Sequence, residues 1–259
     1  MLKNGDNMDM SIVMVACHEG RRMHPTLMSV FRSKAFAVAH DISSEIVIVL
    51  DQPDDNTLRY LDRYRTAPEI RIAETGPGDY GLSRNLGISL ASGRYVSVLD
   101  SHDLICLNWI ISSVTLLMNC REPVIAHPEY LIEFDGGHKI RHLLNSTDPS
   151  FPITDMMVDY VYGASLCSAE KSLFIKHPYP PADKASGFGF TDWHFACETL
   201  AHDVTHQTVP ETVAFIRKRM QVFPPVNPNR HPVMKPTRLF DHNKWNEVID
   251  KIRTKTNAQ

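Results

Sequence analysis

The 259-residue sequence lacks the marks of several protein classes. Its five cysteines are odd in number and scattered, and no CxxC pair occurs, which argues against a disulfide framework or a zinc knuckle and indicates a reducing compartment. The longest nearly apolar run, residues 104–118, is interrupted by Asn108 and is shorter than the roughly 18 residues a membrane span needs. The N-terminus lacks the apolar centre of a signal peptide. We therefore expect a cytoplasmic protein without a transmembrane segment.

An excess of positive charge is also missing. The net charge is −3, so the sequence gives no electrostatic reason to expect nucleic acid as a partner, and no polybasic run indicates binding to anionic lipid. Peripheral attachment to a membrane stays open. The hydrophobic content of 43% and the charged content of 22% are ordinary for a globular protein, and the length suits one large α/β domain or two small ones.

The first hundred residues alternate between short apolar runs and helical patterns. We predict strands at residues 11–17, 45–50, 69–73 and 95–99, and helices at residues 25–36, 55–64 and 81–90. Strands that alternate with helices in this way indicate βαβ units and a mostly parallel sheet.

The second half is less regular. We predict strands at residues 125–134, 160–168 and 208–216, a loop at 178–189, a helix at 191–202, a proline-rich arm at 222–236 and a closing helix at 243–252. The expected division is a Rossmann-like half at 11–103, a less regular half at 104–220 and the arm with its helix at 221–259.

Polar residues follow several of the predicted parallel strands. Glu19 comes just after the first strand, Asp51 ends the second, and Asp100 and His102 follow the fourth. Ligands of such sheets bind outside the carboxyl ends of the strands. These side chains are therefore expected to line one rim, where a binding site would lie.

Asp100 and His102 are two positions apart, so in an extended segment they face the same side. A carboxylate and an imidazole together suit a divalent ion such as manganese better than calcium, which prefers oxygen ligands. In a structural interpretation, Asp100 caps a turn and His102 is an exposed loop residue. Spacing alone does not decide between the two. His202 and His206 are the candidates for a third ligand.

The segment GLSRNLGISLASGRYVSVLDSHD, residues 81–103, resembles a hallmark of family 2 glycosyltransferases with the GT-A fold, whose pattern is G-x-S-x-A-R-N-x-G…A-x-G-x-Y-hydrophobic-L-D-x-D. SIVMVACHE resembles the first strand of that family, EIVIVLDQPDDNT its aspartate-containing second segment, and GFGFTDWHFACETL its G-x-E-D-W segment. The similarity runs from about residue 11 to residue 219, with the motifs in the family's order.

The resemblance implies that residues 11–103 form the nucleotide-sugar-binding half and residues 104–220 the acceptor-binding half, and it implies a role for each matching residue. Asp51 would bind the base of a nucleotide sugar, Arg84 would lie beside the diphosphate, Asp100 would face the ribose and the metal, His102 would ligate Mn²⁺ or Mg²⁺, and Asp192 would be the general base. The donor-binding residues implied as a set are Ala16, Glu19, Asp51, Arg84, Asp100, Ser101 and Arg219.

The sequence departs from the family pattern at three positions. His102 replaces the second aspartate of D-x-D, a variant that resembles the L-D-S-H motif of polypeptide N-acetylgalactosaminyltransferases, which bind manganese through it. Leu50 replaces the first aspartate of the second segment, and Thr191 replaces the glutamate before Asp192.

Elementary chemistry agrees with these roles, although each residue also has a structural alternative. A divalent ion stabilises the charge that develops on a diphosphate leaving group, and arginines such as Arg84, Arg217 or Arg219 add phosphate contacts. Asp192 could take the proton of an acceptor hydroxyl or could simply cap a helix. Glu19 could hold a ribose or cap a turn.

The sequence therefore predicts a GT-A fold and an inverting hexosyl- or N-acetylhexosaminyltransferase of polysaccharide biosynthesis. It would use a nucleotide-sugar donor, expected to be a UDP-sugar, and a saccharide or lipid-linked saccharide acceptor. Two alternatives stay open. One is a nucleotidyltransferase, for which ACHEGRRMHP is a poor Gly-rich loop. The other is a module that binds a nucleotide sugar without turnover, as the departures at Leu50, His102 and Thr191 would suggest.

Overall fold

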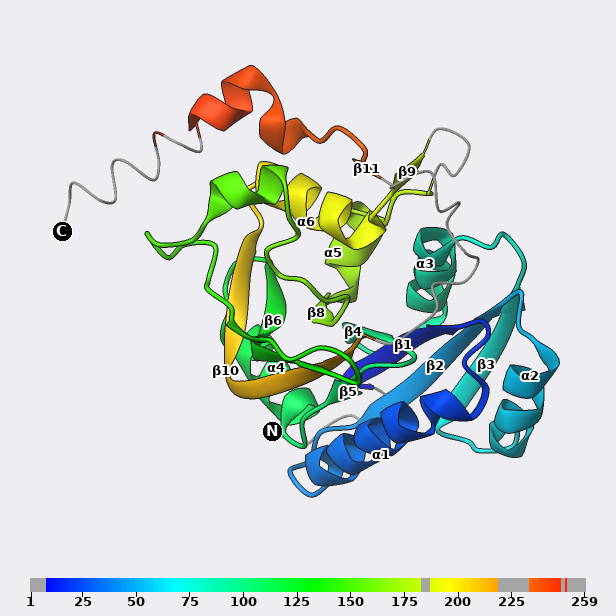
Figure 1. Ribbon diagram of the computed structural model, residues 1–259. Helices are drawn as coiled ribbons and strands as arrows, with labels where there is room; N and C mark the ends of the chain where they lie inside the picture. Colours follow the sequence, from blue (N-terminus) through cyan, green and yellow to red (C-terminus); the bar gives the residue numbers. More distant parts are fainter. Residues whose placement is uncertain (1–7, 183–186, 219–232, 248–249, 251–259) are drawn as a thin grey trace.

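One mixed sheet runs through the whole molecule (Figure 1). The computed structural model describes residues 8–182, 187–218, 233–247 and 250. The strand order is β3 (Ile70–Thr75), β2 (Ser44–Asp51), β1 (Met10–Ala16), β4 (Tyr95–Asp100), β8 (Cys167–Glu170), β6 (Val124–Phe134), β10 (Thr205–Arg217) and β5 (Leu104–Ile105), with β7 (Ile140–His142) paired to β6. β9 (Phe188–Gly189) and β11 (Val233–Met234) form a separate small sheet.

Strand direction separates the two halves. β3, β2, β1 and β4 are mutually parallel, as expected, so their carboxyl ends lie on one rim. The antiparallel pairing of β8 with β4 then joins this half to the rest of the sheet, in which β6 and β10 are parallel to each other. The predicted α/β class with a mostly parallel sheet is confirmed.

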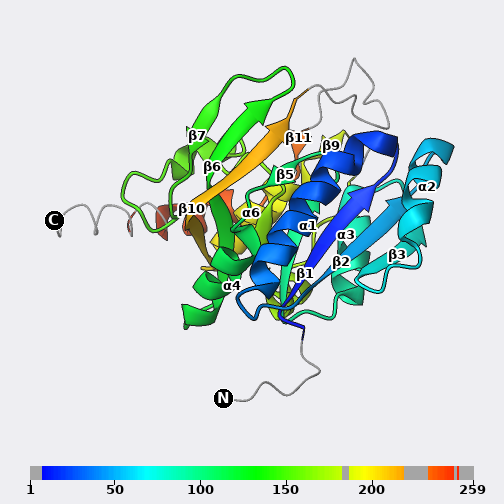
Figure 2. The same cartoon turned by 90° about the horizontal axis from the view of Figure 1, so that it is seen from below.

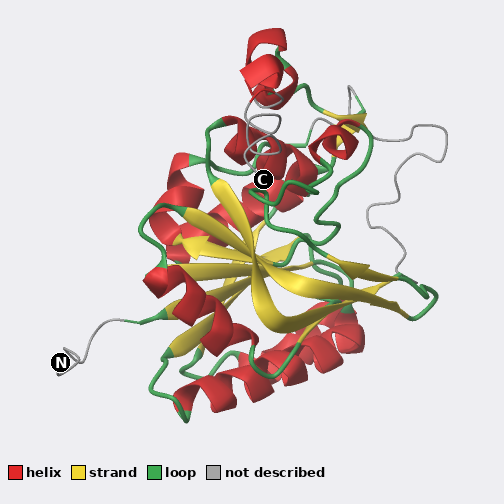
Figure 3. Cartoon of the chain, turned by 90° about the vertical axis from the view of Figure 1, so that its left-hand side faces the viewer, coloured by secondary structure: helices red, strands yellow, loops and turns green. Residues whose placement is uncertain are grey.

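Helices cover both faces of the sheet (Figure 3). The helices are α1 (His24–Val38), α2 (Asp55–Leu61), α3 (Tyr80–Leu90), α4 (Trp109–Asn119), α5 (Lys171–Lys176) and α6 (Thr191–Ala201), with 3-10 turns η1 (Gly20–Met23), η2 (Asp62–Tyr64), η3 (Ile153–Met157) and η4 (Arg238–Phe240). Alternate residues of β1 point to opposite faces. Ile12 belongs to the same apolar cluster as Leu27 of α1, whereas Val13 belongs to the cluster that contains Ile88 of α3.

The predicted elements of the first half are all present within a few residues of their expected bounds. In the second half, the strand predicted at 160–168 is wrong except at its end, where β8 begins at Cys167. Gly163 lies in the left-handed region at φ +58°, which an extended strand does not allow. The helix α4 was not predicted. Residues 219–232 of the arm, with Arg219, lie outside the described residues, and of the closing helix the structure shows residues 242–247 and 250.

Within the described ranges, no helix combines the length and the apolar character that a membrane crossing requires. The predicted cytoplasmic location stays a prediction.

The second half of the chain contains a buried stack of rings. His127 Nε2 lies 2.8 Å from His206 Nδ1, and His206 Nε2 lies 2.9 Å from the Thr199 hydroxyl. The ring of Tyr162 stacks on His127 at a centroid distance of 3.9 Å. Burial lowers the pKa of His206 to about 3, and burial followed by the neighbouring His206 lowers the pKa of His127. Both imidazoles are therefore neutral in the folded protein.

This stack makes stability depend on pH. In the unfolded chain both histidines take up protons below about pH 6.5, which the folded protein resists, so the free energy of unfolding falls as pH is lowered. At pH 5 we expect a loss of about 2 kcal/mol for each buried histidine. Urea denaturation between pH 7 and pH 5 measures it. His206→Gln should flatten the slope, whereas the exposed control His138→Gln should keep it, and equal slopes in both variants would contradict the account.

Candidate active site

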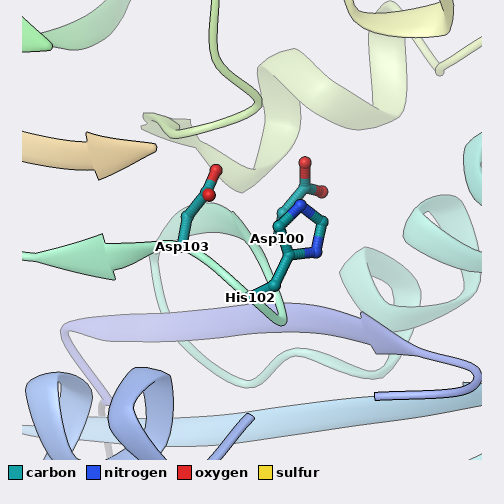
Figure 4. A group of neighbouring side chains, drawn as sticks. All are labelled: Asp100, His102 and Asp103. Carbon is teal, nitrogen blue, oxygen red and sulfur yellow. The ribbon is translucent and has the colours of Figure 1, made fainter. Parts of the chain in front are cut away.

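Three side chains of types that can bind a metal ion gather at the end of β4. Asp100 is the last residue of β4, and a turn closed by the hydrogen bond from Asp103 N–H to the Asp100 carbonyl (3.2 Å) follows. Figure 4 shows the side chains of Asp100 and His102 next to each other and that of Asp103 beside them. One ligand atom from each residue lies within 4.8 Å of the other two. The predicted pairing of Asp100 with His102 is therefore seen in the geometry, and Asp103 joins it.

Contacts from distant strands fix this turn. The backbone N–H of Arg217, at the end of β10, donates to Asp103 Oδ1 at 2.8 Å, and its Nε donates to the His102 carbonyl at 3.2 Å. The same guanidinium pairs with Asp135 at 2.7 Å. The Ser165 hydroxyl accepts the Asp100 N–H at 3.1 Å. Arg217 was considered as a phosphate ligand, but in the structure its guanidinium is engaged in holding the turn.

The chemistry of the three donors fits a divalent ion. A carboxylate, an imidazole and a second carboxylate suit manganese or a similar ion. His102 Nδ1 is buried and has no hydrogen-bond partner among the described residues. An ion about 2.1 Å from its ligands needs them no more than about 4.2 Å apart, so small side-chain rotations suffice. Burial raises the pKa of Asp103 to about 7.

Neither histidine suggested as a third ligand reaches this cluster. His206 lies in the buried ring stack, hydrogen-bonded to His127 and Thr199. His202 Nδ1 lies 2.7 Å from the Glu198 carbonyl at the end of α6. Both suggestions were wrong, and Asp103 is the third candidate ligand in the cluster. Its position next to His102 in the sequence was a usable signal.

A buried arginine, Arg84, links Asp100 of this cluster to the predicted base, Asp192. Arg84, in α3, is only 4% exposed, and its two terminal nitrogens pair with different carboxylates. Nη2 lies 2.7 Å from Asp100 Oδ1, and Nη1 lies 2.8 Å from Asp192 Oδ1. Asp192 stands in the first turn of α6, so the sheet end and this helix meet at Arg84. The guanidinium also lies 5.4 Å from the centre of the Tyr179 ring.

The three charges shift one another. Burial disfavours the charged form of Arg84, but Asp192 and then Asp100 outweigh it and raise the pKa of Arg84 well above its ordinary value. Burial raises the pKa of Asp192, the negative charge of Asp100 adds to the effect, and Arg84 opposes it. For Asp100, burial acts in the same direction, but Arg84 prevails and lowers its pKa. The two carboxylates therefore differ, with Asp192 the more basic.

Asp51 organises the start of α3. Its carboxylate accepts hydrogen bonds from the N–H groups of Gly78 and Asp79 and from the Ser83 hydroxyl, each at 2.8 Å. Asp51 is 1% exposed, and the preceding Leu50 is fully buried. The carboxylate thus holds the helix that carries Arg84. Its predicted contact with a nucleotide base stays a prediction.

The loop after α5 docks on the same helix. The Asn85 side chain donates to the Tyr179 carbonyl at 2.9 Å and accepts its N–H at 3.0 Å. Asp79 Oδ2 accepts the N–H of Ala182 at 2.7 Å. A side chain at Gly81 would place a Cβ 2.3 Å from the Pro180 carbonyl oxygen. Arg84 and Asn85, the R-N pair of the segment 81–103, and its first glycine, Gly81, therefore each have a structural role in this fold.

The remaining predicted donor residues are less engaged with the cluster. Glu19 Oε2 accepts the N–H of Cys17 at 2.6 Å, which is the turn-capping alternative. Ala16 ends β1 and is fully buried, so only its backbone can contact a ligand. Ser101 is 1% exposed, and its hydroxyl has no partner among the described residues. Arg219 lies outside the described residues.

An aromatic pair beside Asp192 was not predicted as a unit. Phe190, directly before α6, has φ +54° and is 49% exposed. Its ring meets that of Trp193 edge-on at 5.8 Å, and Trp193 Nε1 donates to the Met156 carbonyl at 2.7 Å. A non-glycine residue in this conformation next to a candidate base is typical of a functional site.

Known proteins with related sequences are sugar transferases. The chain is 27% identical to the poly(ribitol-phosphate) β-N-acetylglucosaminyltransferase TarP of Staphylococcus aureus over 97 residues, which cover 37% of this chain and 28% of TarP. It is 35% identical to TarS of the same species over 63 residues, covering 24% of this chain and 11% of TarS. The matched segments thus span less than a third of either relative.

Solved structures of TarS share the fold. The structure of a TarS fragment in complex with UDP superposes with a TM-score of 0.61 at 14% identity, covering 95% of this chain and 65% of that one. The complex with UDP-GlcNAc gives the same TM-score at 15% identity, covering 95% of this chain and 66% of that one. The predicted GT-A fold is confirmed.

The match to a family model is broader than either relative. Residues 11–167 match the model described as glycosyl transferase family 2, and this segment includes β1 to β6, Arg84 and the Asp100 cluster. The chain belongs to glycosyl transferase family 2.

Proposed function

We propose that this protein transfers a sugar from a UDP-sugar to a hydroxyl group of a saccharide or polyol acceptor, with inversion at the anomeric carbon. The observation that carries the proposal is the pair of ion contacts from Arg84 to Asp100 and Asp192, at 2.7 and 2.8 Å. Through Arg84, the candidate general base Asp192 is linked to Asp100, a candidate metal ligand. Donor and acceptor chemistry would then take place side by side.

UDP-N-acetylglucosamine is the donor to test first. TarP and TarS are named as β-N-acetylglucosaminyltransferases, and a TarS structure with UDP-GlcNAc shares the fold of this chain. Poly(ribitol phosphate) is the acceptor in the names of both relatives, so a ribitol-phosphate oligomer is the acceptor to test first.

In the proposed reaction, Asp192 accepts the proton of the acceptor hydroxyl while its oxygen attacks the anomeric carbon from the face opposite the diphosphate. The bond between that carbon and the diphosphate oxygen breaks, and UDP leaves with the electron pair. A raised pKa makes Asp192 a better proton acceptor than an ordinary aspartate. Phe190 and Trp193 give an aromatic wall for the acceptor next to Asp192.

Asp100, His102 and Asp103 would hold the divalent ion, with Mn²⁺ or Mg²⁺ as candidates. A bound divalent ion would neutralise charge on the diphosphate leaving group. The turn that carries these ligands is already fixed by Arg217 and Ser165. The LDSH segment resembles the motif through which polypeptide N-acetylgalactosaminyltransferases bind manganese. That it binds manganese in this protein remains a prediction.

Removal of the base should stop transfer. For Asp192→Asn, we expect kcat with UDP-GlcNAc and the oligomer to fall at least about 100-fold, because a well-placed base contributes about 10²–10⁴-fold. Product formation is followed by mass spectrometry. Full turnover in Asp192→Asn would remove Asp192 from the mechanism. A wild-type protein that binds donor but makes no product with any acceptor would favour the non-catalytic module.

The charge at position 84 should set the pH at which the enzyme works. In Arg84→Gln, the positive charge that opposes the raised pKa of Asp192 is gone, so the acidic limb of the pH–rate profile should move to higher pH. Arg84→Lys keeps the charge and is the matched variant, with a limb close to that of the wild type. If the acidic limb of the pH–rate profile of Arg84→Gln stays in place while kcat falls, the role of Arg84 is purely structural.

Metal binding should depend on the turn after β4. For His102→Ala, we expect the affinity for Mn²⁺, measured by calorimetry without donor, to fall at least about tenfold, since even outer partners of metal ligands contribute about 10–100-fold. Asp103→Asn should also weaken binding, whereas the exposed control His138→Ala should bind as the wild type does. Unchanged Mn²⁺ affinity in His102→Ala would refute ligation by this residue.

A further inference from the structure

A cleft lies at the same rim of the sheet as the Asp100 cluster, and Asp192 is not among the residues that line it. Its volume is about 830 Å³, and its walls come from the turn after β1 and from α2. In Figures 1 and 2 the start of α1, which directly follows η1, lies near α2. Four arginines line the cleft, namely Arg21, Arg22, Arg59 and Arg63. We call it the arginine cleft.

The floor of the arginine cleft is fixed by backbone contacts. Gly20 N–H donates to the Thr57 hydroxyl at 2.9 Å, and Asp54 N–H donates to the Cys17 carbonyl at 3.0 Å. Gly20 has φ +54°, and a Cβ there would lie 3.3 Å from Asn56 Cβ, so η1 sits close against α2. The backbones of η1 and α2 are therefore held in a fixed relation to each other.

The positive charge of the cleft is not neutralised by ion pairs. Among the described residues, none of the four arginines pairs with a carboxylate. Two acids also line the cleft, Glu19 and Asp54, and their hydrogen bonds to the Cys17 and Thr57 N–H groups do not remove their formal charge. Four arginines against two acids leave the lining with a formal charge of +2. A chain with a net charge of −3 thus gathers four guanidinium groups in one hollow.

Two of the arginines are held in place, and two are free to reach a ligand. Arg63 lies 4.6 Å from the centre of the Tyr60 ring and donates to the Tyr60 carbonyl, and Arg59 donates to Asn56. Arg21 and Arg22 are exposed and donate no side-chain hydrogen bond within the described part of the chain. One guanidinium group can donate two parallel hydrogen bonds to two oxygens of the same phosphate, which favours a phosphate-bearing ligand.

We infer that the arginine cleft binds phosphate groups of an acceptor chain whose repeating units are joined by phosphodiesters. This inference rests on the proposed function for the identity of the acceptor. β1, β2 and β4 are parallel, so the cleft and the Asp100 cluster lie on the same rim. A chain of several repeats can place one phosphate in the cleft while another repeat presents a hydroxyl to Asp192.

The surroundings of the cleft favour a polymer over a membrane surface. Proteins that lie on membranes place apolar side chains beside their cations. Here Tyr60 is the one aromatic residue of the lining, and it is 3% exposed. A hollow also suits a chain better than a flat lipid surface.

Binding of a ribitol-phosphate hexamer, measured by calorimetry without donor or metal, tests the inference. Arg21→Gln/Arg22→Gln should lower the affinity at least about tenfold, because a charge-assisted hydrogen bond is typically worth that much or more. Arg59→Gln serves as a second, independent variant and should also weaken binding. The matched control is Arg65→Gln, whose side chain pairs with Glu74 and Asp62 outside the cleft and which should bind as the wild type does. Binding should weaken as salt rises.

Unchanged hexamer affinity in both cleft variants would overturn the inference, as would displacement of the hexamer by UDP, which would make the cleft part of the donor site. Displacement by inorganic phosphate at an equal concentration of phosphate groups would mean a site for single phosphates. A cleft variant that loses only its binding to phosphatidylglycerol vesicles would point to a membrane. A wild-type protein that binds the hexamer through the cleft but adds no sugar to it would support this inference while overturning the proposed function.

Discussion

The active site depends on a buried guanidinium shared by two carboxylates. Arg84 is 4% exposed and pairs with Asp100 of β4 and Asp192 of α6. A buried charge is tolerated when it is paired, and removal of one partner leaves an uncompensated charge that typically costs about 3–5 kcal/mol. The sheet end and α6 are therefore tied together by electrostatics at the point where chemistry is proposed.

The two aspartates that pair with Arg84 differ in pKa. Asp100 and Asp192 both contact Arg84, yet burial and mutual repulsion leave Asp192 with a raised pKa, whereas Asp100 has a lowered one. A carboxylate that stays ionised suits a metal ligand, and a more basic one suits a proton acceptor. Two roles can thus arise from one residue type by placement alone.

Much of the fold could be predicted from the sequence, because the first half of the chain consists of local units. Each apolar run such as residues 45–50 is long enough for a buried strand, and each is followed by a helix with its own periodicity. The structure of the second half depends more on contacts between residues that are far apart in the sequence. The strand predicted at 160–168 fails because Gly163 turns the chain and Tyr162 packs on His127, a contact between residues far apart in sequence.

The site could be predicted in part, for a similar reason. Asp100 and His102 are only two positions apart, so a single local turn, closed by the hydrogen bond from Asp103 N–H to the Asp100 carbonyl, is enough to bring them together. The engagement of Arg217 with the turn at Asp103 joins residues more than a hundred positions apart, and no local pattern encodes it. The structural task of Asp51 was also hidden, because its partners lie in the turn before α3 and in α3 itself, beyond α2 and β3 along the chain.

One consequence follows from the short antiparallel pairing of β4 with β8, which spans Tyr95 to Val98. This ladder couples the half that carries Asp100 to the half that carries Asp192, so a slip in its register would pull the two carboxylates apart and break their common arginine. The central ladder therefore has to keep its alignment for the site to exist, whereas the connecting segments around the sheet carry no such requirement.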